Sequence, residues 1–82
     1  MYSLYVIYMD TCPHCHSLMK ALDDRGFKYE RVNVRTDEGL RMARASGSKT
    51  VPVVLFNDQY YSLDNYTESQ ILTLISDQVS QV

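Results

Sequence analysis

The 82 residues and their 45% hydrophobic share predict one domain, spanning residues 1–82, with a modest core. Eight basic and ten acidic residues give a net charge of −2 without a Lys/Arg cluster, which argues against a nucleic-acid-binding surface. No apolar run approaches the roughly 20 residues of a membrane span, and the first residues lack a signal-peptide pattern. We therefore expect a soluble, monomeric, cytoplasmic protein without nucleic-acid or membrane partners.

The first part of the chain predicts a strand, a helix and a second strand. Residues 2–9 are rich in β-branched and aromatic side chains, which indicates a central strand covered on both faces. Residues 13–26 follow as a helix with a proline in its first turn and a glycine at its end. Its buried stripe consists of Cys15, Leu18, Met19 and Leu22. Residues 27–34 predict a strand parallel to the first, although its apolar positions change phase between Arg31 and Val32.

The second part predicts a helix, a hairpin and a final helix. A helix over residues 36–47 begins at a threonine cap and should cover an edge of the sheet. Strands at 51–56 and 59–61 are joined by a turn at 57–58, and a capping box from Thr67 opens the last helix. The side chains expected to pack are Leu40, Met42 and Ala43, then Ile71, Leu72, Ile75 and Val79. The order β-α-β-α-β-β-α predicts an α/β fold with a four-stranded mixed sheet and flanking helices.

The only two cysteines stand three positions apart in Cys12-Pro13-His14-Cys15, between the first strand and the first helix. Peptide dipoles and free N–H groups at a helix N-terminus stabilise a thiolate there. A second thiol one turn away can attack a mixed disulfide formed by the first. A disulfide closing so short a loop would stabilise the fold little, which favours a redox pair over a structural bridge.

Other functions for this motif stay open at this point. Cys12 to His16 also fits the CxxCH pattern of c-type haem attachment, although such cytochromes are mostly helical. The two cysteines with His14 or His16 can be read as ligands of zinc or an iron–sulfur cluster, but one CxxC supplies half a structural zinc site. A third alternative is a binding subunit in which the motif has no redox role.

A CxxC between the first strand and first helix, with Thr50-Val51-Pro52 opening the third strand, resembles the glutaredoxins and the related glutaredoxin-like NrdH-redoxins. Cys15-His16, residues 24–27 and residues 52–54 are closer to the NrdH group, whereas Thr50-Val51-Pro52 is closer to glutaredoxins proper. The resemblance implies a thioredoxin fold and a thiol–disulfide oxidoreductase.

By this resemblance, Cys12 is the attacking thiolate and Cys15 the resolving thiol. The Val51-Pro52 peptide bond is expected to be cis, so that the backbone of residue 51 can pair with an extended substrate. Pro13-His14 resembles the dipeptide of the periplasmic oxidase DsbA. A histidine there is expected to stabilise the thiolate and raise the reduction potential.

The resemblance also implies a reductant and a client. Glutaredoxins carry a cation three positions before the first cysteine and a Gly-Gly after the hairpin, where this chain has Met9 and Ser62-Leu63. Arg35 and Asp64, with Thr50 to Pro52, are therefore the candidate glutathione ligands. We expect no tightly bound cofactor and no metal; the reductant is glutathione or thioredoxin reductase with NADPH. The clients are disulfide-bearing proteins, with ribonucleotide reductase indicated by the resemblance alone.

Overall fold

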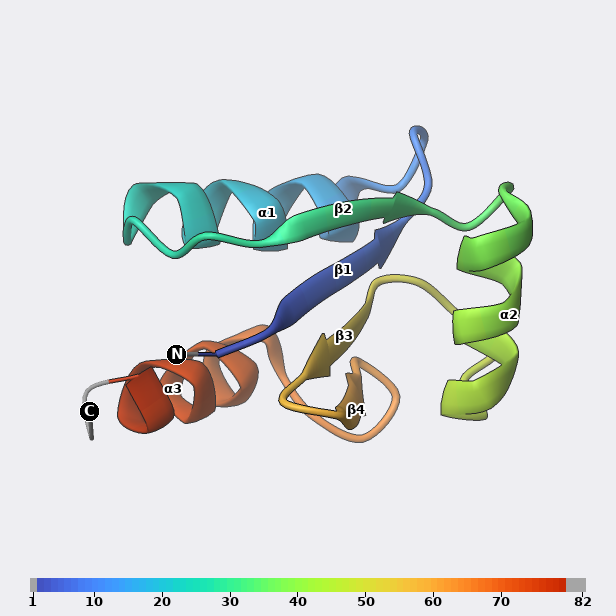
Figure 1. Ribbon diagram of the computed structural model, residues 1–82. Helices are drawn as coiled ribbons and strands as arrows, with labels where there is room; N and C mark the ends of the chain where they lie inside the picture. Colours follow the sequence, from blue (N-terminus) through green and yellow to red (C-terminus); the bar gives the residue numbers. More distant parts are fainter. Residues whose placement is uncertain (1, 80–82) are drawn as a thin grey trace.

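The computed structural model describes residues 2–79, which form a four-stranded sheet and three helices (Figure 1). The elements are β1 (Leu4–Tyr8), α1 (Pro13–Asp24), β2 (Glu30–Asn33), α2 (Asp37–Ser46), β3 (Val53–Phe56), β4 (Gln59–Ser62) and α3 (Glu68–Val79). The predicted element order is confirmed. The first three strands are shorter than the apolar runs that predicted them. Within residues 2–79, no helix has the length and apolarity needed to cross a membrane.

The strands lie in the order β2-β1-β3-β4, with β1 parallel to β2 and the other neighbours antiparallel. The predicted mixed sheet and parallel first pair are therefore confirmed. Ile7 near the end of β1 pairs with Val53 at the start of β3. This register brings the loop that follows β1 beside the segment that precedes β3. The site described below forms where these two segments meet.

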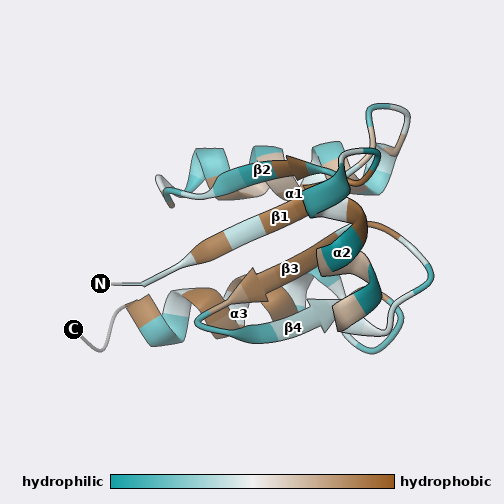
Figure 2. Cartoon of the chain, turned by 45° about the vertical axis from the view of Figure 1, so that its right-hand side comes forward, coloured by the Kyte–Doolittle hydropathy of each residue, from teal (hydrophilic) through white to brown (hydrophobic). Residues whose placement is uncertain are grey.

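Side chains of β1 alternate between apolar clusters on the two faces of the sheet. Leu4 and Val6 belong to the larger cluster, which α1 and α3 complete, and Ile7 belongs to the smaller one with Val32 and Val53. Figure 2 shows the apolar residues concentrated on the inner strands β1 and β3, while the edge strand β4 is more hydrophilic. Two buried faces explain why β1 and β3 read as nearly continuous apolar runs.

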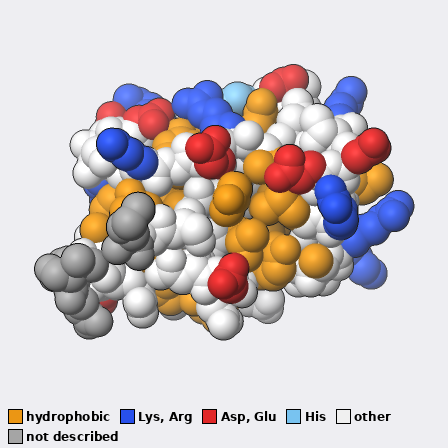
Figure 3. Space-filling view, in the orientation of Figure 1, with side chains coloured by type: hydrophobic (Ala, Val, Ile, Leu, Met, Phe, Trp, Pro, Cys, Tyr) orange, Lys and Arg blue, Asp and Glu red, His pale blue; other side chains and the backbone are white. Residues whose placement is uncertain are grey.

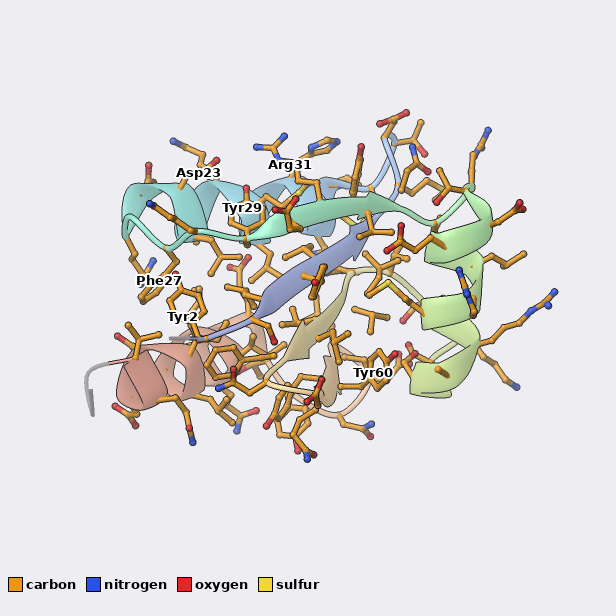
Figure 4. The ribbon with its side chains drawn as sticks, viewed as in Figure 1. Tyr2, Asp23, Phe27, Tyr29, Arg31 and Tyr60 are labelled. Carbon is orange, nitrogen blue, oxygen red and sulfur yellow. The ribbon has the colours of Figure 1, made fainter. Side chains whose placement is uncertain are left out.

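The phase change in the second strand follows from unequal coverage of its two faces. Tyr29, just before β2, packs against the α1 side, and Arg31 lies over its ring at 5.7 Å from the ring centre (Figure 4). Val32 and Val34 pack on the opposite face, in the cluster that includes Met42 of α2. Because α1 covers the first half of this edge and α2 the second, the apolar positions switch faces midway.

Helix α2 stands at the end of the sheet toward which β1 and β2 run (Figure 1), and its packing differs from the prediction in one residue. Met42 is half-buried as predicted, but Leu40 is 43% exposed, so the prediction that it packs in the core is wrong. The buried residue of the helix is Gly39. A Cβ at this glycine would overlap the Asn33 carbonyl group and lie 2.9 Å from Val34 Cα. Close backbone contact at Gly39, together with the packing of Met42 against Val32 and Val34, therefore holds α2 against β2.

Helices α1 and α3 show the predicted ends and faces. The four residues of the α1 stripe are all buried. Gln70 N–H donates to Thr67 Oγ1 at 3.1 Å and Thr67 N–H donates to Gln70 Oε1 at 2.9 Å, which confirms the capping box before α3. Ile71, Leu72 and Ile75 are buried, as predicted.

Candidate active site

Cys12 is the N-cap residue of α1. Its backbone is extended (φ −96°, ψ 107°), and its sulfur accepts a hydrogen bond from the Cys15 N–H at 3.1 Å. Pro13 occupies the first helical position, where its missing N–H costs no hydrogen bond. The thiol therefore takes the place that a serine or aspartate usually takes at a helix start. An N–H aimed at this sulfur interacts more strongly with a thiolate than with a thiol.

The Cys12 sulfur faces the segment that precedes β3. It lies 3.7 Å from the Val51 carbonyl oxygen and can donate its proton there as a thiol. The Val51-Pro52 peptide bond is cis, as the resemblance implied, and the Pro52 side chain is fully buried. Cys12 itself is 8% exposed, so solvent reaches it only at a narrow opening beside Val51.

Cys15 lies behind Cys12, in the core between α1 and the sheet. Its side chain is 0% exposed, and neither cysteine is in a disulfide. Burial, followed by its hydrogen bond with Cys12, raises the pKa of the Cys15 thiol to about 12. Cys15 is consequently protonated at neutral pH, and Cys12 is the sulfur of the pair that solvent can reach.

Two grooves flank the Val51 backbone. The first, which we call the α2 groove, has a volume of about 580 Å³ and runs along α2. Met9, Cys12, Val34 and Leu40 form its largely apolar wall, and Arg44 and Lys49 are its cations. Figure 3 shows hydrophobic side chains gathered over the middle of the molecule toward α2, with Lys and Arg side chains at the outer edge.

The second groove, which we call the α3 groove, has a volume of about 720 Å³ and is more polar. Its lining includes His14, Thr50, Val51, Asp64 and Tyr66. The Asp64 carboxylate of this groove accepts two hydrogen bonds: Thr50 Oγ1 donates to Oδ1 at 3.0 Å, and the Ser48 hydroxyl donates to Oδ2 at 3.0 Å.

A family model for glutaredoxin matches residues 1–61 of the chain. The chain belongs to the glutaredoxin family. It is 38% identical over 52 residues to the glutaredoxin-like protein NrdH of Escherichia coli K12. That match covers 62% of this chain, and it spans only 64% of the length of the relative.

Solved structures confirm the predicted thioredoxin-type fold. The NrdH-redoxin of E. coli, whose structure was described in terms of a thioredoxin-like activity profile, superposes with a TM-score of 0.66 at 33% identity. The superposition covers 73% of this chain and 80% of that one. A glutaredoxin from Archaeoglobus fulgidus gives a TM-score of 0.70 at 27% identity and covers 92% of this chain and 87% of that one.

Most residues that the resemblance implicated lie together. The two cysteines, Val51 and Pro52 meet at the α1 N-terminus, and His14, Thr50 and Asp64 line the adjoining α3 groove. Arg35 is exposed in the turn between β2 and α2 and lines neither groove. The cations of the α2 groove, Arg44 and Lys49, were not among the predicted ligands.

Two further polar contacts near the site were not predicted. Ser48 contacts Asp64, and the position of a serine in a loop carried no pattern that indicated this. His16 Nε2 donates to the Asp10 carbonyl oxygen at 2.6 Å, which ties the loop before Cys12 to α1. In the part of the chain that the structure describes, His, Cys, Asp and Glu side chains form no group of three that could hold a metal. A haem bonded to both cysteines would require the Cys15 sulfur at the surface, whereas that sulfur is fully buried.

Proposed function

We propose that the protein is a thiol–disulfide oxidoreductase in which Cys12 attacks and Cys15 resolves. The observation that carries this proposal is the position of the Cys12 sulfur, between the Cys15 N–H and the Val51 carbonyl group. A sulfur at the start of a helix, at the edge of an open groove, is a nucleophile placed for disulfides. The family assignment supports the same chemistry.

The reaction is two successive thiol–disulfide exchanges. The Cys12 thiolate attacks one sulfur of a substrate disulfide, the substrate S–S bond breaks, and the other substrate sulfur leaves as a thiolate that takes a proton. Cys15 then loses its proton and attacks the Cys12 sulfur, which releases the second substrate thiol. Two electrons pass to the substrate, and the protein ends with a Cys12–Cys15 disulfide. Because Cys15 is buried and protonated, it acts only after the substrate has joined Cys12.

We further propose that a flavoprotein thioredoxin reductase, with NADPH, is the electron donor, and that no tightly bound cofactor is needed. The apolar wall of the α2 groove, with Met9 where glutaredoxins carry a cation, suits a protein partner. The thioredoxin-like activity profile described for the E. coli NrdH-redoxin supports this donor. Glutathione is the second candidate, because Arg44 and Lys49 in the same groove could pair with its carboxylates.

The proposed clients are disulfide-bearing proteins, with ribonucleotide reductase first among them because the relatives carry the NrdH name. We place the reaction in the cytoplasm, since a chain with one dithiol pair and no other cysteine suits a reducing compartment. Reduction of an oxidised class I ribonucleotide reductase by the reduced protein would support the client. Equal rates with an unrelated protein disulfide would contradict it.

One experiment separates the two donors. The oxidised protein is mixed either with thioredoxin reductase and NADPH, or with glutathione, glutathione reductase and NADPH, and NADPH loss is followed. We expect rapid oxidation of NADPH in the first mixture only. Rapid oxidation of NADPH in the second mixture alone would identify glutathione as the electron donor. No oxidation of NADPH in either mixture would contradict the proposed oxidoreductase function.

We also propose that Pro13-His14 raises the reduction potential. His14 is exposed and lines the α3 groove near the first cysteine. Its cationic form would stabilise the Cys12 thiolate and hence the reduced state. Glutaredoxins lie at roughly −200 to −230 mV and DsbA near about −120 mV, so we expect His14→Tyr to shift the couple to a more negative value. Titration against glutathione measures the shift, and equal potentials would contradict this role.

A further inference from the structure

Asp64 links the two loops that border the Cys12 opening. Its carboxylate is bound on one oxygen by Thr50 Oγ1 and on the other by Ser48 Oγ, both at 3.0 Å. Thr50 and Ser48 lie 14 and 16 positions earlier in the chain, in the loop between α2 and β3. We call these three residues the Asp64 clasp. Hydrogen bonds to an ionised acceptor are stronger than those between neutral groups, so the carboxylate is a firm anchor for both hydroxyls.

The clasp acts on Thr50, the residue directly before Val51. The Ser48 hydroxyl has one proton, and its oxygen lies 3.0 Å from both Asp64 Oδ2 and the Thr50 carbonyl oxygen. A hydrogen bond to the ionised carboxylate is the stronger of the two, which assigns the proton to Asp64. The same Ser48 oxygen accepts the Thr50 N–H at 3.3 Å. Asp64 therefore holds Thr50 directly through its side chain and, through Ser48, at its backbone N–H.

This support matters because no strand pairing holds the segment. Strand β3 begins at Val53, two residues after Val51, and α2 ends at Ser46. Between these ends, the side-chain hydrogen bonds of Ser48 and Thr50 restrain the backbone before Val51, and the fully buried Pro52 anchors it on the other side. A substrate that adds as an extended strand must find the Val51 N–H and carbonyl in a fixed direction, since main-chain hydrogen bonds provide the affinity in this binding mode.

We propose that Asp64 is a positioning residue for protein disulfides: directly and through Ser48 it holds Thr50, the residue before the Val51 backbone on which an extended substrate docks. This inference rests on the proposed oxidoreductase function. It differs from the role of glutathione ligand that the resemblance implied for Asp64, because the carboxylate acts here on hydroxyls of its own chain and not on the ligand.

The test compares Asp64→Asn with the double variant Ser48→Ala/Thr50→Val and with the triple combination, using insulin as the protein disulfide. We expect KM for insulin to rise about fivefold in each, with kcat and the reduction potential unchanged, because the sulfurs are untouched. Fivefold corresponds to about 1 kcal/mol, the net value of an ordinary hydrogen bond. The triple variant should be no worse than the double, since the clasp acts as a unit.

One control sharpens the comparison: Asp58→Asn makes the same charge change in the β3–β4 turn and should keep the wild-type KM. An unchanged KM in Asp64→Asn and in the double variant would overturn the proposal. Loss of glutathione-dependent reduction in Asp64→Asn, but not in the double variant, would also overturn it, because that result would identify Asp64 as a glutathione ligand. If the wild-type protein reduces neither insulin nor the small aromatic disulfide DTNB, the proposed oxidoreductase function is contradicted, independently of the role of the Asp64 clasp.

Discussion

Replacing Gly39 with alanine tests how α2 is held against the sheet. In the structure, the added Cβ would overlap the Asn33 carbonyl oxygen and lie 2.7 Å from the carbonyl carbon and 2.9 Å from Val34 Cα. All three atoms belong to the backbone, so no change of side-chain rotamer relieves the overlap. The helix or the loop after β2 must shift, and with it the wall of the α2 groove beside Cys12.

The magnitude follows from two opposing effects. Overpacking of a rigid site costs about 3 kcal/mol, at the upper end of its usual range, because only backbone can move. Alanine in place of glycine inside a helix stabilises the folded state by about 1 kcal/mol, because its helix propensity is higher. We therefore expect Gly39→Ala to lower the free energy of unfolding by about 2 kcal/mol and Tm by about 10 °C.

Urea unfolding followed by circular dichroism at 222 nm measures this loss. Glu38→Ala, one residue earlier in the exposed first turn, is the matched control and should change stability by about 0.5 kcal/mol or less. A Gly39→Ala variant as stable as the wild type, or more stable, would refute the reasoning. That result is expected of a solvent-exposed helical glycine, where reduced freedom of the unfolded chain dominates.

Two other predictions concern the capping box and the buried thiol. Thr67→Ala should lower the free energy of unfolding by about 1 kcal/mol, measured in urea, because it removes one partner of the capping box; an unchanged midpoint would contradict this. The raised pKa of Cys15 means that the folded protein keeps a proton that the unfolded chain releases near its ordinary value of 9.0. Stability of the reduced protein should therefore be fully present below about pH 9 and fall toward pH 12, by at most about 1.4 kcal/mol per pH unit. Cys15→Ala should lack this part of the slope, and an identical slope in the variant would contradict the assignment.

The spacing of apolar residues predicted those helices and strands that bury the same face along their whole length. The α1 stripe is buried along its whole length, and the inner strands are apolar because an apolar cluster lies on each of their faces. The second strand could not be read so simply, because its two halves are covered on opposite faces by different helices. Leu40 was assigned to the core because apolar spacing cannot tell a core from the wall of an open groove.

The part of the candidate site that lies within the Cys12–Cys15 motif could be predicted from the sequence. The cysteine spacing indicated a redox pair, and the resemblance placed Val51-Pro52 opposite it. The Asp64 clasp could not be predicted from the sequence, because it depends on loop conformations that bring Asp64 to Thr50 and Ser48, 14 and 16 residues earlier. The place of Cys12 at the start of a helix was predicted, and the structure adds which N–H reaches its sulfur, that of Cys15.

The central claim is that Cys12 attacks first and Cys15 resolves. The most direct measurement is trapping: Cys15→Ser and Cys12→Ser are each incubated with insulin, alkylated and analysed by mass spectrometry. We expect Cys15→Ser to accumulate a mixed disulfide through Cys12, since nothing then resolves it, and Cys12→Ser to form none because Cys15 is buried. A mixed disulfide through Cys15 in Cys12→Ser, formed as fast as the one in Cys15→Ser, would contradict the assignment of roles.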